Sequence, residues 1–286
     1  MHSTHLNVSL LSLFYHNRNI IMKLQIASDL HLDMIKYSNK EELYSRLIEP
    51  SAQYLALVGD IAEEHTEIFY DFLTWTSKRF IKVFLVLGNH EYYNCDNYDK
   101  VNERINEFCK DTNIEFLDNK HIEIIENDIT YHILGSTLWS FIPINKYTEC
   151  MFGMNDYKLI RPHMAPKHTN NMHNKAALWL MKETQNINKD KNTNKIIVLT
   201  HHAPLYKNVA NPIFETEDNT LRNAFCTDMS FIFNLPDICI DVWVYGHTHW
   251  ITDFRYGMHD SRIVANCYGY GYPENIKYNK AKVIEV

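Results

Sequence analysis

The segment that decides the fold reads IKVFLVLGNHE, residues Ile81–Glu91. Its first half is short, apolar and rich in β-branched and aromatic residues, and a glycine halts it, which is typical of a buried strand. An amide, an imidazole and a carboxylate then follow at Asn89, His90 and Glu91. Because open α/β sheets bind ligands in the crevice at the carboxyl ends of their strands, these polar side chains are candidate site residues.

Four further apolar runs end in the same way. The polar ends are Asp29-Leu30-His31 after Lys23–Ala27, Gly59-Asp60 after Tyr54–Val58, His201-His202 after Ile196–Thr200, and Gly246-His247-Thr248-His249 after Asp241–Tyr245. In an extended segment residues i and i+2 point to the same side, so both ends of D-x-H and H-x-H can reach one cavity. Each motif alone is a weak or moderate signal, but the five together predict a metal site.

The donor set indicates more than one ion. Two aspartates, one asparagine and several histidines are more ligands than one tetrahedral ion needs. Two ions about 3.5–4 Å apart that share a carboxylate would use them all. Imidazole suits zinc, iron and manganese, while carboxylate and amide oxygens also accept harder ions. We therefore expect two divalent metal ions of the Mn, Fe or Zn kind.

Strands and helices alternate through the first part of the chain, which predicts parallel strands with crossover helices. The expected helices there are Lys40–Ile48, Glu67–Phe80 and Tyr98–Cys109. Next, short β-like runs at Ile114–Leu117, Ile122–Ile125 and Ile129–Leu134 are expected as antiparallel additions. Residues 143–166 are expected to be irregular, followed by a helix at Lys175–Ile187, a polar loop at 186–194, and further strands at Ile263–Ala265 and Lys282–Val286. The prediction is one α/β domain, residues 22–286, with two layered sheets and outer helices.

Composition narrows the class of protein. The net charge of −7 argues against a general nucleic-acid binder. Six scattered cysteines without a CxxC pair favour reduced thiols, and we expect a cytoplasmic protein. The apolar piece at residues 8–14 is too short for a membrane span. Residues 1–21 are interpreted as a poorly ordered extension, with Met22 as an alternative start.

The ordered motif series closely resembles the calcineurin-like metallophosphoesterase superfamily, from Lys23 to about Tyr272. The resemblance implies a four-layer αββα sandwich, with two mixed sheets flanked by helices and a dinuclear metal site at the strand ends. It implies that the first ion takes Asp29, His31, Asp60 and His249, and the second takes Asp60, Asn89, His201 and His247, with Asp60 bridging. Only one of the adjacent His201 and His202 should coordinate. We choose His201, which directly ends the strand, and expect His202 to line the substrate pocket.

The resemblance also implies the chemistry, which is phosphoester hydrolysis by attack of a hydroxide that bridges the two ions. His90, whose neighbour Asn89 is the ligand, is expected to protonate the leaving group. Glu63 is expected to orient that histidine, although an exposed carboxylate at a helix start is an equal alternative. Arg161 is a candidate contact for the substrate phosphate.

Departures from the family narrow the substrate. The branch of Ser/Thr protein phosphatases carries Gly-Asp-x-x-Asp-Arg-Gly, whereas this chain reads GDIAEEH over residues 59–65 and lacks the arginine. The acidic net charge also weakens a nuclease interpretation. A small phosphomonoester, phosphodiester or nucleotide is then the expected substrate. The alternatives are a nuclease, or a non-catalytic protein-interaction scaffold with the same fold.

Overall fold

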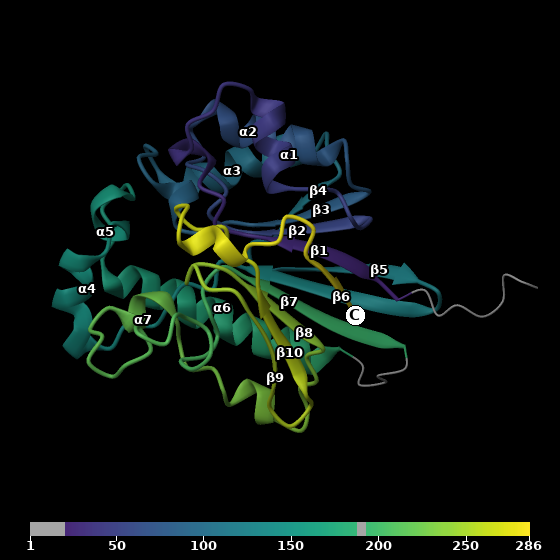
Figure 1. Ribbon diagram of the computed structural model, residues 1–286. Helices are drawn as coiled ribbons and strands as arrows, with labels where there is room; N and C mark the ends of the chain where they lie inside the picture. Colours follow the sequence, from purple (N-terminus) through teal and green to yellow (C-terminus); the bar gives the residue numbers. More distant parts are fainter. Residues whose placement is uncertain (1–20, 188–192) are drawn as a thin grey trace, which may run out of the picture.

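Two mixed β-sheets lie face to face in the computed structural model, which describes residues 21–187 and 193–286 (Figure 1). The first sheet has the strand order β11-β1-β2-β3-β4. Its strands are β1 (Lys23–Ala27), β2 (Tyr54–Val58), β3 (Lys82–Val86), β4 (Ile114–Phe116) and β11 (Val283–Glu285). Strands β1 to β4 run parallel, and β11 pairs antiparallel with β1 at the edge.

The second sheet has the order β5-β6-β7-β8-β10-β9. Its strands are β5 (Lys120–Glu126), β6 (Ile129–Ser136), β7 (Asn194–Thr200), β8 (Val242–Tyr245), β9 (Thr252–Tyr256) and β10 (Ser261–Ala265). The central strands β6, β7, β8 and β10 run parallel, and β5 and β9 close the two edges as antiparallel partners.

Helices cover the outer faces of both sheets (Figure 1). Helices α1 (Lys40–Leu47), α2 (Glu67–Ser77) and α3 (Tyr98–Cys109) cover the first sheet, and α6 (Pro166–Asn186) covers the second. The shorter helices are α4 (Tyr147–Gly153), α5 (Asp156–Leu159), α7 (Arg222–Phe225) and the 3₁₀ turns η1 (Leu32–Met34), η2 (His90–Tyr92), η3 (Ile144–Lys146), η4 (Ile232–Asn234) and η5 (Glu274–Lys277). A search of the described helices finds none with the length and apolar character of a membrane span.

Burial explains why the two sheets stack. Alternate side chains of both sheets, such as Leu24, Phe84, Ile197 and Val244, form one fully buried core between them. Separate apolar clusters lie between each sheet and its own helices. A strand with both faces buried has a continuous apolar sequence, as β2 and β3 do. The predicted four-layer αββα sandwich is confirmed.

Three local predictions need correction. Strand β4 is parallel to β3 in the first sheet, not an antiparallel addition, because α3 crosses over and returns the chain in the same direction. Residues 143–166 hold helices α4 and α5 rather than an irregular excursion, and α6 begins at Pro166 rather than Lys175. Strand β9 was not predicted. The extension expected at residues 1–21 lies outside the described residues apart from Ile21, as does most of the loop expected at 186–194.

Candidate metal centre

The carboxyl ends of β1, β2 and β3 meet those of β7 and β8, and hydrogen bonds join the sheets there. His201 at the end of β7 donates from Nδ1 to the carbonyl of Val58, over 2.9 Å. The Asp29 carboxylate accepts the backbone N–H of His247, also at 2.9 Å. The structure thus brings together the polar strand ends. We call their seven candidate ligands the strand-end site: Asp29, His31, Asp60, Asn89, His201, His247 and His249.

One half of the strand-end site centres on Asp60 and His201. The Nε2 atom of His201 lies 3.3 Å from Asp60 Oδ2 and 3.1 Å from Asn89 Oδ1. His247 completes this group, with one potential ligand atom within 4.8 Å of those of Asp60 and His201. All four side chains are buried, so they have lost contact with bulk water.

The other half consists of Asp29, His31 and His249, whose potential ligand atoms also lie within 4.8 Å of one another. The two histidine Nε2 atoms are 3.1 Å apart, and His249 Nε2 is 3.5 Å from Asp29 Oδ1. Asp60 lies between the halves, since its Oδ2 atom is also 4.0 Å from His31 Nε2. This position is the one that a bridging carboxylate requires.

The backbone at the site is strained. Five of the seven candidate ligands have positive φ angles: Asp29 at 54°, His31 at 44°, Asp60 at 55°, His247 at 66° and His249 at 48°. A non-glycine residue in this left-handed region costs about 1–3 kcal/mol, and such residues cluster at functional sites. The rest of the fold must therefore offset this cost, which argues that the ligand arrangement itself is selected.

Gly88 shows how closely the strand ends approach one another. A Cβ atom at this position would collide with Asp60 Oδ1 and lie 2.6 Å from His201 Nε2. Only glycine leaves room for both side chains beside the backbone.

Glu91 holds the turns in place. Its carboxylate accepts three backbone N–H groups, from Gly88 at 2.7 Å, Asp60 at 3.0 Å and Ile61 at 2.6 Å. These bonds join the loop after β3 to the loop after β2. Glu91 therefore anchors both turns from a buried position.

Asp156 is a site residue that the sequence did not reveal. Its fully buried Oδ1 accepts from Asn89 Nδ2 at 2.8 Å and from the Tyr93 hydroxyl at 2.5 Å. Because Asp156 holds the amide nitrogen of Asn89, the Oδ1 atom of Asn89 faces His201 and the strand-end site. Asp156 lies within residues 143–166, which were expected to be irregular, and no motif there marks it as a site residue.

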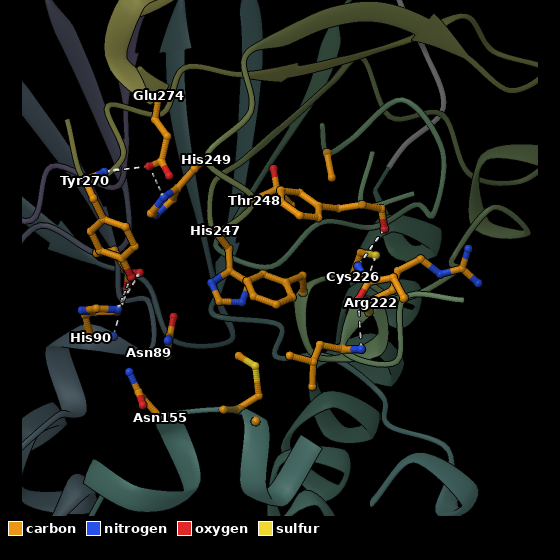
Figure 2. Close-up of a pocket in the computed structure, with 18 of the residues that line it drawn as sticks. Asn89, His90, Asn155, Arg222, Cys226, His247, Thr248, His249, Tyr270 and Glu274 are labelled. Carbon is orange, nitrogen blue, oxygen red and sulfur yellow. Dashed lines mark hydrogen bonds and ion pairs between the residues drawn. The ribbon is translucent and has the colours of Figure 1, made fainter. Parts of the chain in front are cut away.

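Tyr270 and Glu274 were also missed. Glu274 Oε2 lies 2.7 Å from His249 Nδ1 and accepts the backbone N–H of Tyr270 at 2.8 Å (Figure 2). The Tyr270 ring packs against His31 and His249, with centroids 4.5 Å away in both cases. The C-terminal segment thus covers the half of the site that contains His31 and His249. No spacing in the sequence connects it to the histidines.

His90 lies beside the strand-end site, and one of its ring nitrogens is within 4.8 Å of potential ligand atoms of His31 and Asp60. Its Nε2 atom is 3.2 Å from the Tyr270 hydroxyl and 3.9 Å from Asp60 Oδ2. Its backbone N–H donates to Asp60 Oδ1 over 2.9 Å. The ring therefore faces the same space as the ligands, where it can hold a proton for a reacting group.

Electrostatics favour cation binding. Burial holds the pKa of His31 and His247 well below the usual value, so both rings are neutral near pH 7 and offer a nitrogen lone pair. Burial also lowers the pKa of His201, but Asp60 outweighs it and raises that pKa to about 10. Cation binding at this position would release the proton of His201.

The donor set fits divalent metal ions. Val58 and Glu274 engage the outer nitrogens of His201 and His249, which orients their Nε2 atoms inward. This is the arrangement by which neighbouring groups fix the tautomer of a metal-ligating histidine. The two carboxylates and the Asn89 oxygen provide the oxygen ligands.

Three predicted site residues make other contacts than expected. Asn94 Nδ2 lies 3.0 Å from each carboxylate oxygen of Glu63, and His65 Nδ1 lies 3.6 Å from Glu63 Oε2. Arg161 is exposed and contacts His163. His202 is buried, with Nδ1 2.8 Å from Ser140 Oγ and its ring 4.1 Å from that of His247. Among the described residues, none of these three lines the cavity at the site.

That cavity has a volume of about 430 Å³ and extends from the strand-end site toward α7. Asn89, His90, His247 and His249 lie at one end and Arg222 and Cys226 at the other (Figure 2). The side chains of Met154, Phe214, Leu221 and Phe225 form an apolar part of the wall. The Phe225 ring stacks on His247 at a centroid distance of 4.8 Å.

Comparison with known proteins agrees with this geometry. Residues 22–250 match the family model described as calcineurin-like phosphoesterase. The chain is 34% identical to the uncharacterised protein L509 of Acanthamoeba polyphaga mimivirus, over 92% of this chain and 96% of that protein.

Two solved structures share the fold. Phosphopantetheinyl hydrolase from Mycobacterium tuberculosis has a TM-score of 0.71 at 17% identity, covering 93% of this chain and 96% of its own. A dimetal phosphatase from Danio rerio has a TM-score of 0.53 at 12% identity, covering 87% and 88%. Because the family model matches most of this chain, the chain belongs to the calcineurin-like phosphoesterase family.

Proposed function

We propose that this protein is a metal-dependent phosphoesterase that hydrolyses a small phosphomonoester or phosphodiester with an extended, largely apolar or aromatic organic group. One observation carries the proposal: a single cavity joins the strand-end site to an apolar wall. The phosphate fits the end with the metal ligands, and the organic group fits the end formed by Met154, Phe214 and Phe225.

The proposed reaction needs residues that hold the metal ions and a residue that donates a proton. Asp29, His31, Asp60 and His249 would hold one ion, and Asp60, Asn89, His201 and His247 the other. When bound, the ions supply the Lewis acidity that activates the attacking water and neutralises the phosphoryl oxygens. His90 holds a proton at Nε2, on the cavity side, and donates it to the departing oxygen. The roles of Glu63, His202 and Arg161 stay predictions without a supporting contact to the cavity.

The proposed substrate class is tested with a panel. Chelator-treated protein is supplied with Mn²⁺, Fe²⁺ or Zn²⁺ and assayed on p-nitrophenyl phosphate, its bis-ester, nucleotides and a phosphopantetheinyl ester. The last is included because a protein of the same fold bears that substrate class in its name. Turnover that chelator removes and metal restores is expected. Metal-loaded protein that hydrolyses nothing in the panel would favour the non-catalytic scaffold.

Phe225 tests the role of the apolar wall. We expect Phe225→Ala to raise KM by about 10-fold for esters of extended apolar or aromatic groups, since burying one large apolar side chain contributes about 1.5–3 kcal/mol. Methyl phosphate, which has no apolar group large enough to contact this ring, is expected to change little. Phe231→Ala, at an exposed phenylalanine that does not line the cavity, is the matched control. Equal KM changes for short and extended esters would contradict the assignment.

Manganese and a cytoplasmic location are finer proposals. Manganese accepts the mixed histidine and carboxylate ligands of the strand-end site, and the metal panel compares it directly with iron and zinc. The cytoplasmic location rests on the scattered cysteines of the sequence.

A further inference from the structure

A second group of histidines and acids lies on the hairpin of β5 and β6. His121 and Glu123 belong to β5, and His132 stands opposite Glu123 on β6. Ile122 and Ile124 pack against the core between the sheets, so His121 and Glu123, which alternate with them, face outward. One potential ligand atom from each of His121, Glu123 and His132 lies within 4.8 Å of the others.

The outer nitrogens of both histidines have acceptors. His132 Nε2 lies 2.9 Å from Asn194 Oδ1, and His121 Nδ1 lies 3.5 Å from Glu183 Oε2 on α6. These partners favour the protons on the outer nitrogens, which leaves lone pairs on His121 Nε2 and His132 Nδ1. The two inner nitrogens are nevertheless only 3.0 Å apart, and Glu123 Oε1 is 3.4 Å from His132 Nδ1. Two lone pairs and a carboxylate at such distances repel one another, and a cation bound among them would remove this repulsion.

We propose that His121 Nε2, His132 Nδ1 and Glu123 bind a divalent ion of the zinc class, with Glu183 and Asn194 orienting the two rings. Two ligands of one tetrahedral zinc ion lie roughly 3.3–3.4 Å apart, given bond lengths near 2.0–2.1 Å. The observed separations of 3.0 and 3.4 Å are close to this spacing. The Glu123 side chain is 54% exposed, so the ion has a path from solvent and room for a water as fourth ligand.

This hairpin site has a structural consequence. β5 is an edge strand whose hydrogen-bonded partner within the sheet is β6. An ion held by both strands, with Glu183 beside it, ties the hairpin edge to α6. The hairpin site shares no residue with the strand-end site.

The experiment counts ions. Full-length protein is stripped with a chelator, equilibrated with Zn²⁺, freed of excess by gel filtration and analysed by mass spectrometry for zinc per chain. The wild type is expected to hold one ion more than His132→Gln. Because only the difference is used, the result is independent of how many ions the strand-end site holds. His163→Gln, at an exposed histidine, is the matched control and should equal the wild type.

Equal zinc content in the wild type and His132→Gln would overturn the proposal, and the histidine pair would then share a proton instead. If circular dichroism shows that His132→Gln does not fold, Glu123→Ala decides, since this side chain is half exposed. Titration of Zn²⁺ against a chromophoric chelator is expected to show one class of ion bound at least about 10-fold more weakly in Glu123→Ala. An unchanged titration would contradict the site.

Discussion

His90 is the residue on which the proposed proton transfer depends. We expect His90→Ala to retain its metal and to slow turnover by about 10²–10⁴-fold on esters with poor leaving groups, which need a proton as they depart. Esters of p-nitrophenol have a leaving group that departs without a proton, so their kcat should fall less. The measurement is kcat for both ester types, beside metal content. His65→Ala, at an exposed histidine, is the control. A rate unchanged on both esters would remove His90 from the reaction.

The residue scale also shows what the sequence can and cannot predict. Asp29 and His31, and likewise His247 and His249, lie in one site as predicted, although the predicted reason does not hold. These four residues follow the strands and have positive φ angles, so they are not extended. Asp156 was not predictable from such a motif, because its contact with Asn89 joins residues 67 positions apart through the packing of a loop. Glu63 contacts Asn94 and His65, and its action on His90 stays a prediction. A spacing of three residues does not determine where a loop turns.

At the scale of elements, the C-terminal segment supports the half of the strand-end site formed by Asp29, His31 and His249. Glu274, at the start of η5, accepts from His249 Nδ1 and so keeps Nε2 directed at Asp29 and His31. We expect Glu274→Ala to weaken metal binding by about 10–100-fold, the usual effect of losing the partner of a ligating histidine. Competition with a chromophoric chelator measures the affinity.

Glu274→Gln serves as the matched variant, because its amide oxygen can still accept from His249. Its affinity should fall between those of the wild type and Glu274→Ala. If Glu274→Ala bound metal as tightly as the wild type, the segment would be a cover without influence on His249.

Elements with strong periodicity were predictable, and short ones were not. Strands β1 and β2 and helix α3 have the predicted bounds. Gly59 ends the apolar run of β2, and the polar pair Ser28-Asp29 follows β1. Strand β4 spans only Ile114–Phe116, and a run of this length contains no information about its direction. The direction follows from the crossover through α3, which is a property of the sheet rather than of the run.

At the scale of the whole molecule, ion pairs link the edges of the two sheets. Asp253 on β9 accepts two hydrogen bonds of 2.8 Å from Arg262 on β10, and Lys282, just before β11, lies 2.8 Å from it. The bonds from Arg262, followed by Lys282, lower the pKa of Asp253 to about 2. Because the folded pKa is below the unfolded one, these pairs stabilise the fold above about pH 4, and the effect is lost as the pH falls toward 2.

The predicted effect of Asp253→Asn is a loss of about 1 kcal/mol in the free energy of unfolding near pH 7, since the group is partly exposed and solvent screens it. The difference from the wild type should shrink as the pH falls from about 4 to 2. Urea unfolding at several pH values measures it. A difference that stays constant over this interval would show that the ion pairs are not its source.

The central claim is that the strand-end site is the catalytic metal centre, and Asp60→Asn tests it most directly. Asparagine tolerates the positive φ of 55° at this position, so the fold should survive while the bridging charge is lost. The measurement is kcat/KM on p-nitrophenyl phosphate with saturating Mn²⁺, beside Asp99→Asn on the exposed surface of α3. We predict a loss of at least about 10²-fold for Asp60→Asn and none for Asp99→Asn. A folded Asp60→Asn protein with wild-type kcat/KM would contradict the account.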